Sequence, residues 1–201
     1  MIDKSIESIG VMMYKTDTNN YPKYSLPEGY YFEFYKKGDE NNWAQIEMSV
    51  GQYDTKEEAL SGFERSFIQD QNLILEERML FVKDLEGNAV ATASLWNGFY
   101  LGEECQRIHW VAVMDKCAGL GIAKAMLTKL MDLYNELGYY GFIYLSTGTR
   151  NFPAISIYRK FGFIDYHGEV DPRSNVKSEA YYIRNEKAFE IINSKIAEHK
   201  K

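Results

Sequence analysis

The chain has 201 residues, of which 45% are hydrophobic, and a formal net charge of -6 at neutral pH. This length allows one well-buried core and is short for two independent domains, so we expect one domain over residues 1–201. Lysine and arginine form no block that could neutralise a run of phosphates, and no apolar stretch reaches the roughly twenty residues that cross a bilayer. We therefore expect neither a nucleic-acid partner nor a membrane partner.

The cysteine usage is typical of a cytoplasmic protein with reduced thiols. Cys105 and Cys117 have neither a disulfide nor a metal-site spacing, and the start "MIDKSIESIGVMMY" has no basic region followed by an apolar run. We interpret both cysteines as small packing residues and expect no metal.

The first half of the chain alternates short strand patterns with two helix patterns. The linker that carries Pro22 and Pro27 should be irregular. Thr55 and Glu58 have the spacing of a capping box, which favours a helix over residues 56–69. The turn signal "LEGN" separates two strands of an antiparallel meander. The other elements expected here are a helix at residues 40–50 and strands at residues 9–15, 30–36, 78–84, 89–96 and 106–113.

The second half changes to an order of helix, strand, helix and strand. This order indicates an α/β fold, and a crossover helix between two strands implies that they run parallel. A last strand at residues 180–184 and a charged amphipathic helix at about residues 185–200 should close the chain. The other helices are expected at residues 119–137 and 151–161, and the other strands at residues 141–147 and 162–167.

The stretch "HWVAVMDKCAGLGIAKAML" places two glycines between a strand and a helix. Gly119 and Gly121 carry no side chain that would keep a phosphate away from the first turn of the helix, whose N–H groups lack partners. The loop therefore suits a phosphate or pyrophosphate, while the alternative is a plain tight turn. A Walker loop would need Gly-Lys-Ser/Thr, and a dinucleotide fingerprint would need a third glycine where Lys124 stands, so both are disfavoured.

Two ordered segments carry a family resemblance. "KCAGLGIA" resembles the glycine loop of the GCN5-related N-acetyltransferases (GNAT family), and "NFPAISIYRKFGF" resembles their downstream signature. The resemblance is clearest over residues 107–166. It implies a mixed central sheet of about six or seven strands flanked by helices, with the fourth and fifth strands parallel and splayed. Lys116 stands where the family usually has arginine or glutamine. It supplies a positive charge but not the planar guanidinium group that binds a phosphate through two hydrogen bonds.

The resemblance also implies a site for acetyl-CoA, with its pyrophosphate on the backbone N–H groups of the glycine loop and its pantetheine arm between the parallel strands. The residues that the resemblance assigns to acetyl-CoA are Val111, Ala112, Val113, Cys117, Ala118, Gly119, Leu120, Gly121, Ile122, Ala123 and Asn151.

Two residues are candidates for proton transfer. Tyr158 stands where the family has its catalytic tyrosine and is a candidate to protonate the departing thiolate. The alternative is a core tyrosine. Strand alternation places His109 on the face of Val111 and Val113, unless a bulge intervenes, where an imidazole could accept the amine proton. A histidine packed in a half-buried strand is the alternative.

Other residues could contact the acceptor. Glu103 and Glu104 are rival bases, although glutamates in a loop are more often plain solvated charges. Trp43, Tyr53 and Phe63 fall in or beside the helical pair that walls the acceptor pocket in the family, and Tyr53 is the candidate for substrate contact.

These observations predict an acetyl-CoA-dependent N-acetyltransferase that moves an acetyl group to a primary amine by direct attack in a ternary complex. The acceptor can be a small-molecule amine or a protein amine, and a homodimer stays open. One alternative is a catalytically idle acyl-CoA-binding regulatory protein, and another is an interaction module without a coenzyme site.

Overall fold

The structure is a computed structural model that describes residues 5–68, 74–100, 102–170 and 177–199. The chain divides into two compact units. The first unit contains Lys23–Trp96 and Ile108–Gly138, and the second contains Ile2–Pro22, Asn97–Arg107 and Tyr139–Lys201. Each unit is described by itself below.

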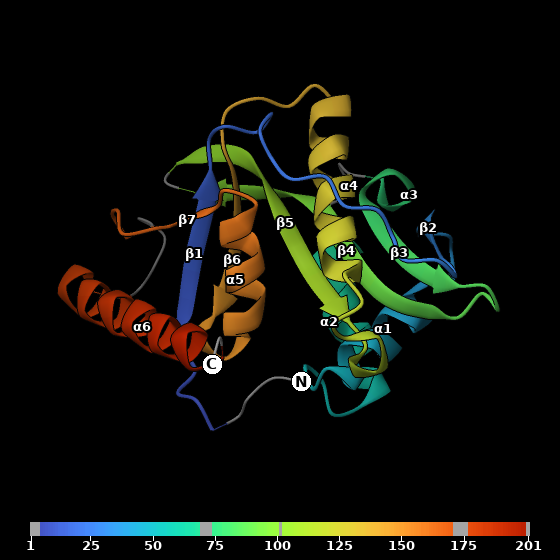
Figure 1. The fold of residues 1–201 in the computed structure, drawn as a ribbon, viewed down its shortest axis with the longest axis horizontal. Coiled ribbons are helices and arrows are strands. Elements are labelled where there is room, and N and C mark those ends of the chain that lie inside the picture. The colour runs from blue at the N-terminus through green and yellow to red at the C-terminus, as the bar shows by residue number, and fades with distance from the viewer. Residues whose placement is uncertain (1–4, 69–73, 101, 171–176, 200–201) are drawn as a thin grey trace. The chain divides into compact units, whose positions relative to one another are not determined.

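Seven strands form a mixed sheet in the order β2-β3-β4-β5-β6-β1-β7 (Figure 1). The β5–β6 pair is parallel, while β1–β6, β1–β7, β2–β3 and β3–β4 are antiparallel. The predicted mixed sheet with flanking helices is therefore confirmed. The strands are β1 Gly10–Lys15, β2 Tyr30–Phe34, β3 Met79–Asp84, β4 Ala89–Tyr100, β5 Glu103–Val113, β6 Ile143–Gly148 and β7 Ile164–Asp165.

The parallel pair is the one that the crossover helix predicted, and it is β5 and β6 in the chain order. Its ladder joins Gln106 to Ile143 and Arg107 to Tyr144. These pairs use only the first residues of β6, as expected where two parallel strands splay.

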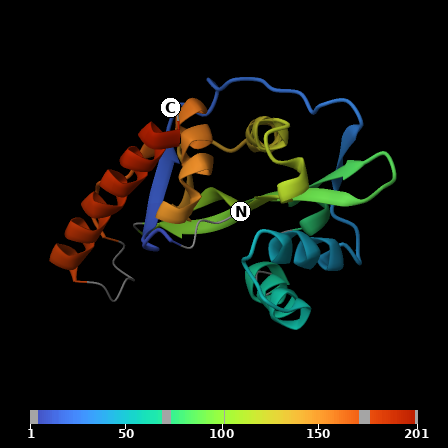
Figure 2. The same cartoon turned by 60° about the horizontal axis from the view of Figure 1, so that its bottom comes forward.

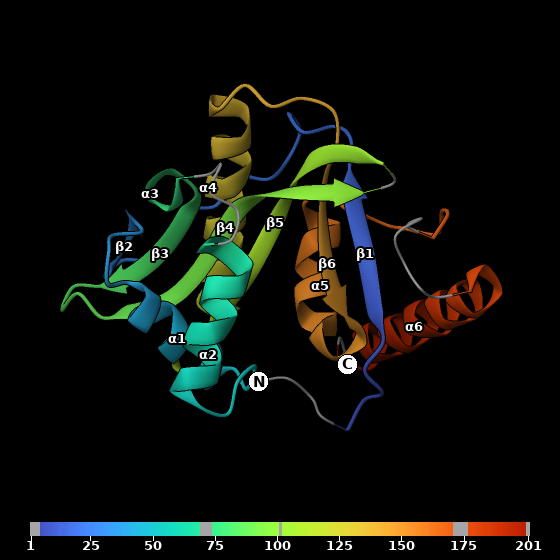
Figure 3. The ribbon, with the colours of Figure 1, turned by 180° about the vertical axis from the view of Figure 1, so that it is seen from behind.

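In the first unit, helices cover both faces of β3 and β4. Figure 2 shows α4 on one side of these strands and α1 with α2 on the other, and Figure 3 shows the latter pair from their own side. Large rings fill the space beneath α1 and α2, among them Trp43, Phe63, Phe67, Phe81 and Trp96. The helices of this unit are α1 Glu40–Ser49, α2 Lys56–Phe63, the π-helix η1 Glu64–Ile68, α3 Leu75–Arg78, the 3-10 helix η2 Asp115–Cys117 and α4 Ile122–Glu136.

The helix predicted over residues 56–69 begins as expected but changes its geometry. Thr55 Oγ1 accepts a hydrogen bond from the N–H of Glu58 at 3.2 Å, which is the predicted cap. The α-helical part ends at Phe63, and η1 continues the chain to Ile68 with π geometry. Gln69, the predicted last residue, lies outside the described residues.

In the second unit, β4 is longer than predicted. The Asn-Gly pair at positions 97 and 98 resembles a turn signal, yet the strand continues to Tyr100. A Cβ atom on Gly98 would lie 2.3 Å from the hydroxyl oxygen of Tyr144, so the glycine makes room for that ring rather than a turn.

The helices of the second unit are the 3-10 helix η3 Thr149–Asn151, α5 Phe152–Lys160 and α6 Ser178–His199. Helix α6 packs against β1 and α5. Its buried residues Asn185, Ala188, Phe189 and Ile192 follow helical spacing. The strand predicted at residues 180–184 is wrong, because these residues form the start of α6. Tyrosines and isoleucine favour a strand only when a neighbouring strand can pair with them.

Candidate active site

The predicted anion loop opens a long amphipathic helix. Gly119 and Gly121 adopt left-handed backbone angles, with φ of 79° and 85°, that other residues rarely adopt. Gly121 is the N-cap of the 15-residue helix α4 and provides no side-chain cap. Nothing lies within 4 Å of a Cβ atom placed on either glycine, so this backbone is open to an approaching group.

The backbone N–H groups of this loop are not equally available. Those of Cys117 and Ala118 donate to the carbonyls of Met114 and Asp115 at 2.8 Å and 3.0 Å. Within the part of the chain that the structure describes, the first helical backbone bond runs from Ala125 to Gly121. The N–H groups open to an anion therefore belong to residues 119–124, so Cys117 and Ala118 drop out of the predicted backbone contacts of residues 117–123.

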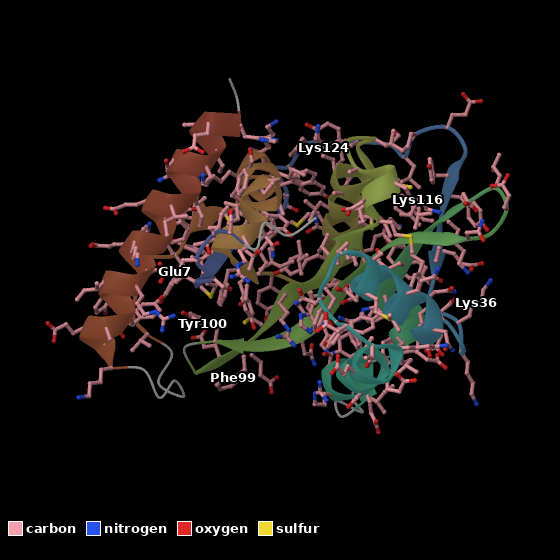
Figure 4. The ribbon with its side chains drawn as sticks, turned by 90° about the horizontal axis from the view of Figure 1, so that it is seen from below. Glu7, Lys36, Phe99, Tyr100, Lys116 and Lys124 are labelled. Carbon is pink, nitrogen blue, oxygen red and sulfur yellow. The ribbon has the colours of Figure 1, made fainter. Side chains whose placement is uncertain are left out.

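Two lysines lie beside the start of α4 (Figure 4). Lys116 is exposed on η2. Lys124 lies on the first turn of α4, and its Nζ is 5.3 Å from the centroid of the Tyr24 ring. Both cations add to the positive end of the helix dipole, so the loop favours an anion of high charge.

A positive φ at Trp110 and two successive side chains on one face indicate a bulge in strand β5. Among the described non-glycine residues, Trp110 alone has a positive φ, of 48°. His109 and Trp110 consequently contact the same helical layer: the His109 ring lies 5.6 Å from Phe67, and the Trp110 ring lies 5.1 Å from Trp43. Ala112 belongs to the same buried cluster. His109 therefore shares its face with Trp110 and Ala112, and its predicted alternation with Val111 and Val113 is wrong because of the bulge.

Three rings, which we call the aromatic triad, meet on this face: Trp43, Tyr53 and Trp110. Their centroids are 5.1 Å apart for Trp43–Trp110, 5.9 Å for Trp43–Tyr53 and 6.0 Å for the stacked pair Tyr53–Trp110. Gly62 leaves room for the Tyr53 ring to pack against α2, because a Cβ atom at this position would lie 2.2 Å from the tyrosine hydroxyl. Tyr53, the predicted substrate contact, is thus packed within this cluster of rings.

Glu47 is a functional candidate that the sequence interpretation missed. It lies one turn after Trp43 on α1, only 3% of it is exposed, and burial raises the pKa of its carboxyl group to about 8. Its Oε1 has no hydrogen-bond partner among the described residues. A buried polar atom without a partner costs about 1–3 kcal/mol, so its retention calls for a reason. The signal in the sequence is a carboxylate at the i+4 position from a tryptophan within a buried stripe.

Tyr158 is buried in the second unit. It lies on α5, 7% exposed, with its ring 6.2 Å from Phe163. Burial raises the pKa of its hydroxyl group to about 12, so the group keeps its proton at every physiological pH. Asn151 precedes α5, but its side chain makes no cap and its Nδ2 donates to Thr147 Oγ1 at 3.4 Å.

The remaining candidates are two glutamates and the two cysteines. Glu103 and Glu104 are exposed at the start of β5, in the second unit. Cys117 is buried, with its Sγ 3.6 Å from the hydroxyl of Tyr30, whereas Cys105 is half-buried. The described residues hold no group of three His, Cys, Asp or Glu that would suit a metal ion, and none of their helices is long and apolar enough to span a bilayer.

Comparisons with known proteins agree with this geometry. The model of the acetyltransferase (GNAT) family matches residues 41–163. No curated protein matches the chain. A GCN5-related N-acetyltransferase from Sphaerobacter thermophilus is similar, with a TM-score of 0.60 and 22% identity over 83% of this chain and 53% of its own. A GNAT-family acetyltransferase from Colwellia psychrerythraea has a TM-score of 0.59 and 14% identity over 79% of this chain and 53% of its own.

A predicted acetyltransferase from Clostridium acetobutylicum, whose structure was determined with acetyl-CoA, has a TM-score of 0.55 and 17% identity. The match covers 71% of this chain and 94% of that protein. This chain spans about half the length of the Sphaerobacter and Colwellia proteins. The structural matches establish a shared fold, and the family model extends over more than half of the sequence. The chain belongs to the GNAT family of acetyltransferases.

Proposed function

We propose that the protein transfers an acetyl group from acetyl-CoA to a primary amine by direct attack in a ternary complex. The observation that carries this proposal is the left-handed Gly119 and Gly121 loop at the start of α4, with N–H groups available over residues 119–124. A pyrophosphate suits this loop because it accepts several N–H hydrogen bonds at a positive helix end. Lys116 and Lys124 add positive charge beside it.

The residues present fit a coenzyme of this kind. Acetyl-CoA, when bound, supplies the acetyl thioester and a thiolate leaving group. The backbone of Val111 and Val113 would hold the pantetheine arm, as the family resemblance implies. The Trp110 bulge interrupts the regular strand there, and a bulge leaves a backbone group outside the ladder, where it can polarise the acetyl carbonyl.

Tyr158 would donate a hydrogen bond to the sulfur as charge develops on it. Its pKa of about 12 lies well above the roughly 8.5 of a thiol in water, so complete proton transfer requires that the site also raise the pKa of the thiol. The same exclusion of water that raises the tyrosine pKa acts in that direction on a thiol.

Calorimetric titration with CoA and with acetyl-CoA tests the coenzyme site. A panel of primary amines, with thiol release measured against a reaction without amine, then tests transfer. We expect both coenzymes to bind and at least one amine to release thiol. Absence of coenzyme binding contradicts the whole proposal, whereas binding without release from any amine favours the acyl-CoA-binding regulator.

A further inference from the structure

The aromatic triad and Glu47 form a site whose polar atoms are unsatisfied. Glu47 Oε1, Trp43 Nε1 and Trp110 Nε1 are all buried and lack hydrogen-bond partners among the described residues. The two tryptophan rings contact each other, and Glu47 follows Trp43 by one helical turn. One acceptor and two donors without partners indicate a missing polar group rather than a single packing defect.

Glu47 Oε1 and the ring faces favour a cation, whereas the two indole N–H groups need an acceptor, which an ammonium group does not supply and another part of the substrate or a water must. A carboxylate accepts hydrogen bonds from an ammonium group, and the faces of tryptophan and tyrosine rings attract positive charge. An apolar group would leave Oε1 without a donor.

Tyr53 belongs both to the aromatic triad and to the wall of a surface depression. An open depression of about 470 Å³ is lined by Tyr53, Glu57, Glu58, Ser61 and Arg65. Burial and, after it, the nearby Glu47 carboxyl group raise the pKa of Tyr53, so the carboxyl group lies close to a residue that lines the depression.

We infer that the acceptor of this protein is a cationic primary amine whose ammonium group binds Glu47 beside the rings of Trp43, Tyr53 and Trp110, and that the Glu47 carboxylate accepts a proton from it. This inference rests on the proposed function and names the substrate class of the same site.

The protons balance as follows. One N–H bond of the ammonium breaks and an O–H bond forms on Glu47, which leaves a neutral amine with a free lone pair. The nitrogen forms a bond to the acetyl carbon, the carbon–sulfur bond breaks, Tyr158 gives its proton to the departing thiolate, and the second amine proton replaces the one that Tyr158 gave. Glu47 returns its proton to solvent.

Other charged groups around Glu47 do not supply this function. Arg65 faces Tyr53 from η1 and lowers its pKa, but its Nη1 donates to Ser61 Oγ at 2.7 Å. His109 on β5 contacts Phe67 and Trp110. Glu57 and Glu58 line the depression outside Tyr53 and attract a cation toward it.

Proton release separates this role from a structural one. In the free protein the buried carboxyl group is neutral at pH 7, since its pKa is about 8. An ammonium ion beside it favours the carboxylate, so binding of the cation should release a proton.

The experiment uses n-butylammonium chloride as the probe, with n-butanol and sodium butyrate as neutral and anionic counterparts. Binding is followed by tryptophan fluorescence at pH 7, because Trp43 and Trp110 lie at the site, and proton release by calorimetry in two buffers of different ionisation enthalpy. The variants are Glu47→Gln, which keeps the shape of the side chain, and Glu86→Gln, which removes an exposed charge in the β3–β4 turn. Acetyl-CoA binding is measured in each variant as well.

We expect the wild type and Glu86→Gln to bind butylammonium in preference to butanol and butyrate, with release of more than half a proton. Glu47→Gln should bind it at least fivefold more weakly, release no proton, lose at least tenfold in kcat/KM for amines, and retain acetyl-CoA binding. Equal binding of butylammonium and butanol, or undiminished amine transfer by Glu47→Gln, overturns the inference and leaves the proposed function intact. If the wild type does not bind acetyl-CoA, the proposed function is contradicted instead. The fluorescence titration with butylammonium then still tests whether Glu47 binds a cation.

Discussion

A carboxyl group that is buried without a partner makes stability fall as pH rises. Burial raises the pKa of Glu47 from 4.5 to about 8. Between these values the unfolded chain carries a carboxylate while the folded chain keeps the proton, so the unfolded state is favoured progressively. Preferential protonation of Glu47 in the folded state stabilises the protein fully below about pH 4.5, and this stabilisation is lost by about pH 8. The free energy of unfolding should therefore fall by up to about 4–5 kcal/mol over this range.

We therefore predict that Glu47→Gln makes unfolding less sensitive to pH between 5 and 8 and stabilises the protein most at pH 8. Urea unfolding of the wild type and the variant at several pH values measures this difference. Glu86→Gln is the control, because Glu86 is exposed. Parallel curves for the wild type and Glu47→Gln would show that the carboxyl group is not held neutral by burial.

His109 serves packing in the structure, where its ring lies against Phe67 and its carbonyl accepts a hydrogen bond from Ser94 Oγ at 2.9 Å. His109→Gln should lower stability by about 1–2 kcal/mol and reduce activity by a factor that does not change with pH. Melting temperatures and pH-rate profiles of both proteins test this. A loss of kcat/KM confined to neutral pH would instead return His109 to the role of base.

Tyr158 should matter for turnover and not for binding. Tyr158→Phe keeps the buried ring but removes its proton, so kcat should fall roughly tenfold to a thousandfold while the Kd of acetyl-CoA stays nearly unchanged. Steady-state kinetics with the best amine, together with calorimetry, measures the two effects. A kcat within twofold of wild type would exclude Tyr158 as the proton donor.

At the scale of elements, the start of α4 is the anchor of the proposed coenzyme site. Gly121→Glu would place both bulk and negative charge where N–H groups are open to an anion, and would also strain a backbone with φ of 85°. We expect thermal stabilisation by acetyl-CoA to disappear while the circular dichroism spectrum persists. Gly87→Glu, at a left-handed glycine with φ of 83° in the β3–β4 turn, imposes the same backbone strain and should leave coenzyme binding unchanged. Normal binding by a folded Gly121→Glu protein would remove the basis of the proposal.

The same element shows why part of the fold is predictable. Helix α4 has apolar residues at helical spacing, among them Ile122, Met126 and Leu130, and all three are buried. Periodicity and the glycine pair are local signals, so the sequence alone is enough to locate both the helix and its anion loop. The start of α6 is different, because "AYYIR" carries a local preference for strand and only packing against β1 and α5 makes it helical.

The site proposed for the acceptor amine depends on contacts between residues that are distant in sequence. The positive φ of Trp110 is unusual for a bulky residue, and the Trp43 ring that contacts it lies more than sixty residues earlier. Alternation along β5 cannot reveal such a bulge, which is why it assigns His109 to the wrong face. Glu47 likewise reads as an exposed helical charge until its neighbours are known.

At the scale of the whole molecule, 29 acidic and 23 basic side chains give the protein a negative field at neutral pH. A negative field raises the local concentration of cations, and salt screens it because the Debye length shrinks from roughly 30 Å at 0.01 M to about 8 Å at 0.15 M. A buried pair is screened much less, so the contact with Glu47 should survive added salt.

We predict that kcat/KM for n-butylamine, measured with saturating acetyl-CoA, falls a few-fold between about 10 and 300 mM salt. 1,4-Diaminobutane, which carries two positive charges, should show a steeper fall, and a zwitterionic amino acid almost none. Glu47→Gln should lower kcat/KM for the amines at every salt concentration without changing how steeply kcat/KM falls with salt. The steepness depends on the charge of the whole surface, whereas the uniform decrease depends on the buried carboxylate. Identical slopes for the monoamine, the diamine and the zwitterion would show that the charge of the molecule does not select its acceptor.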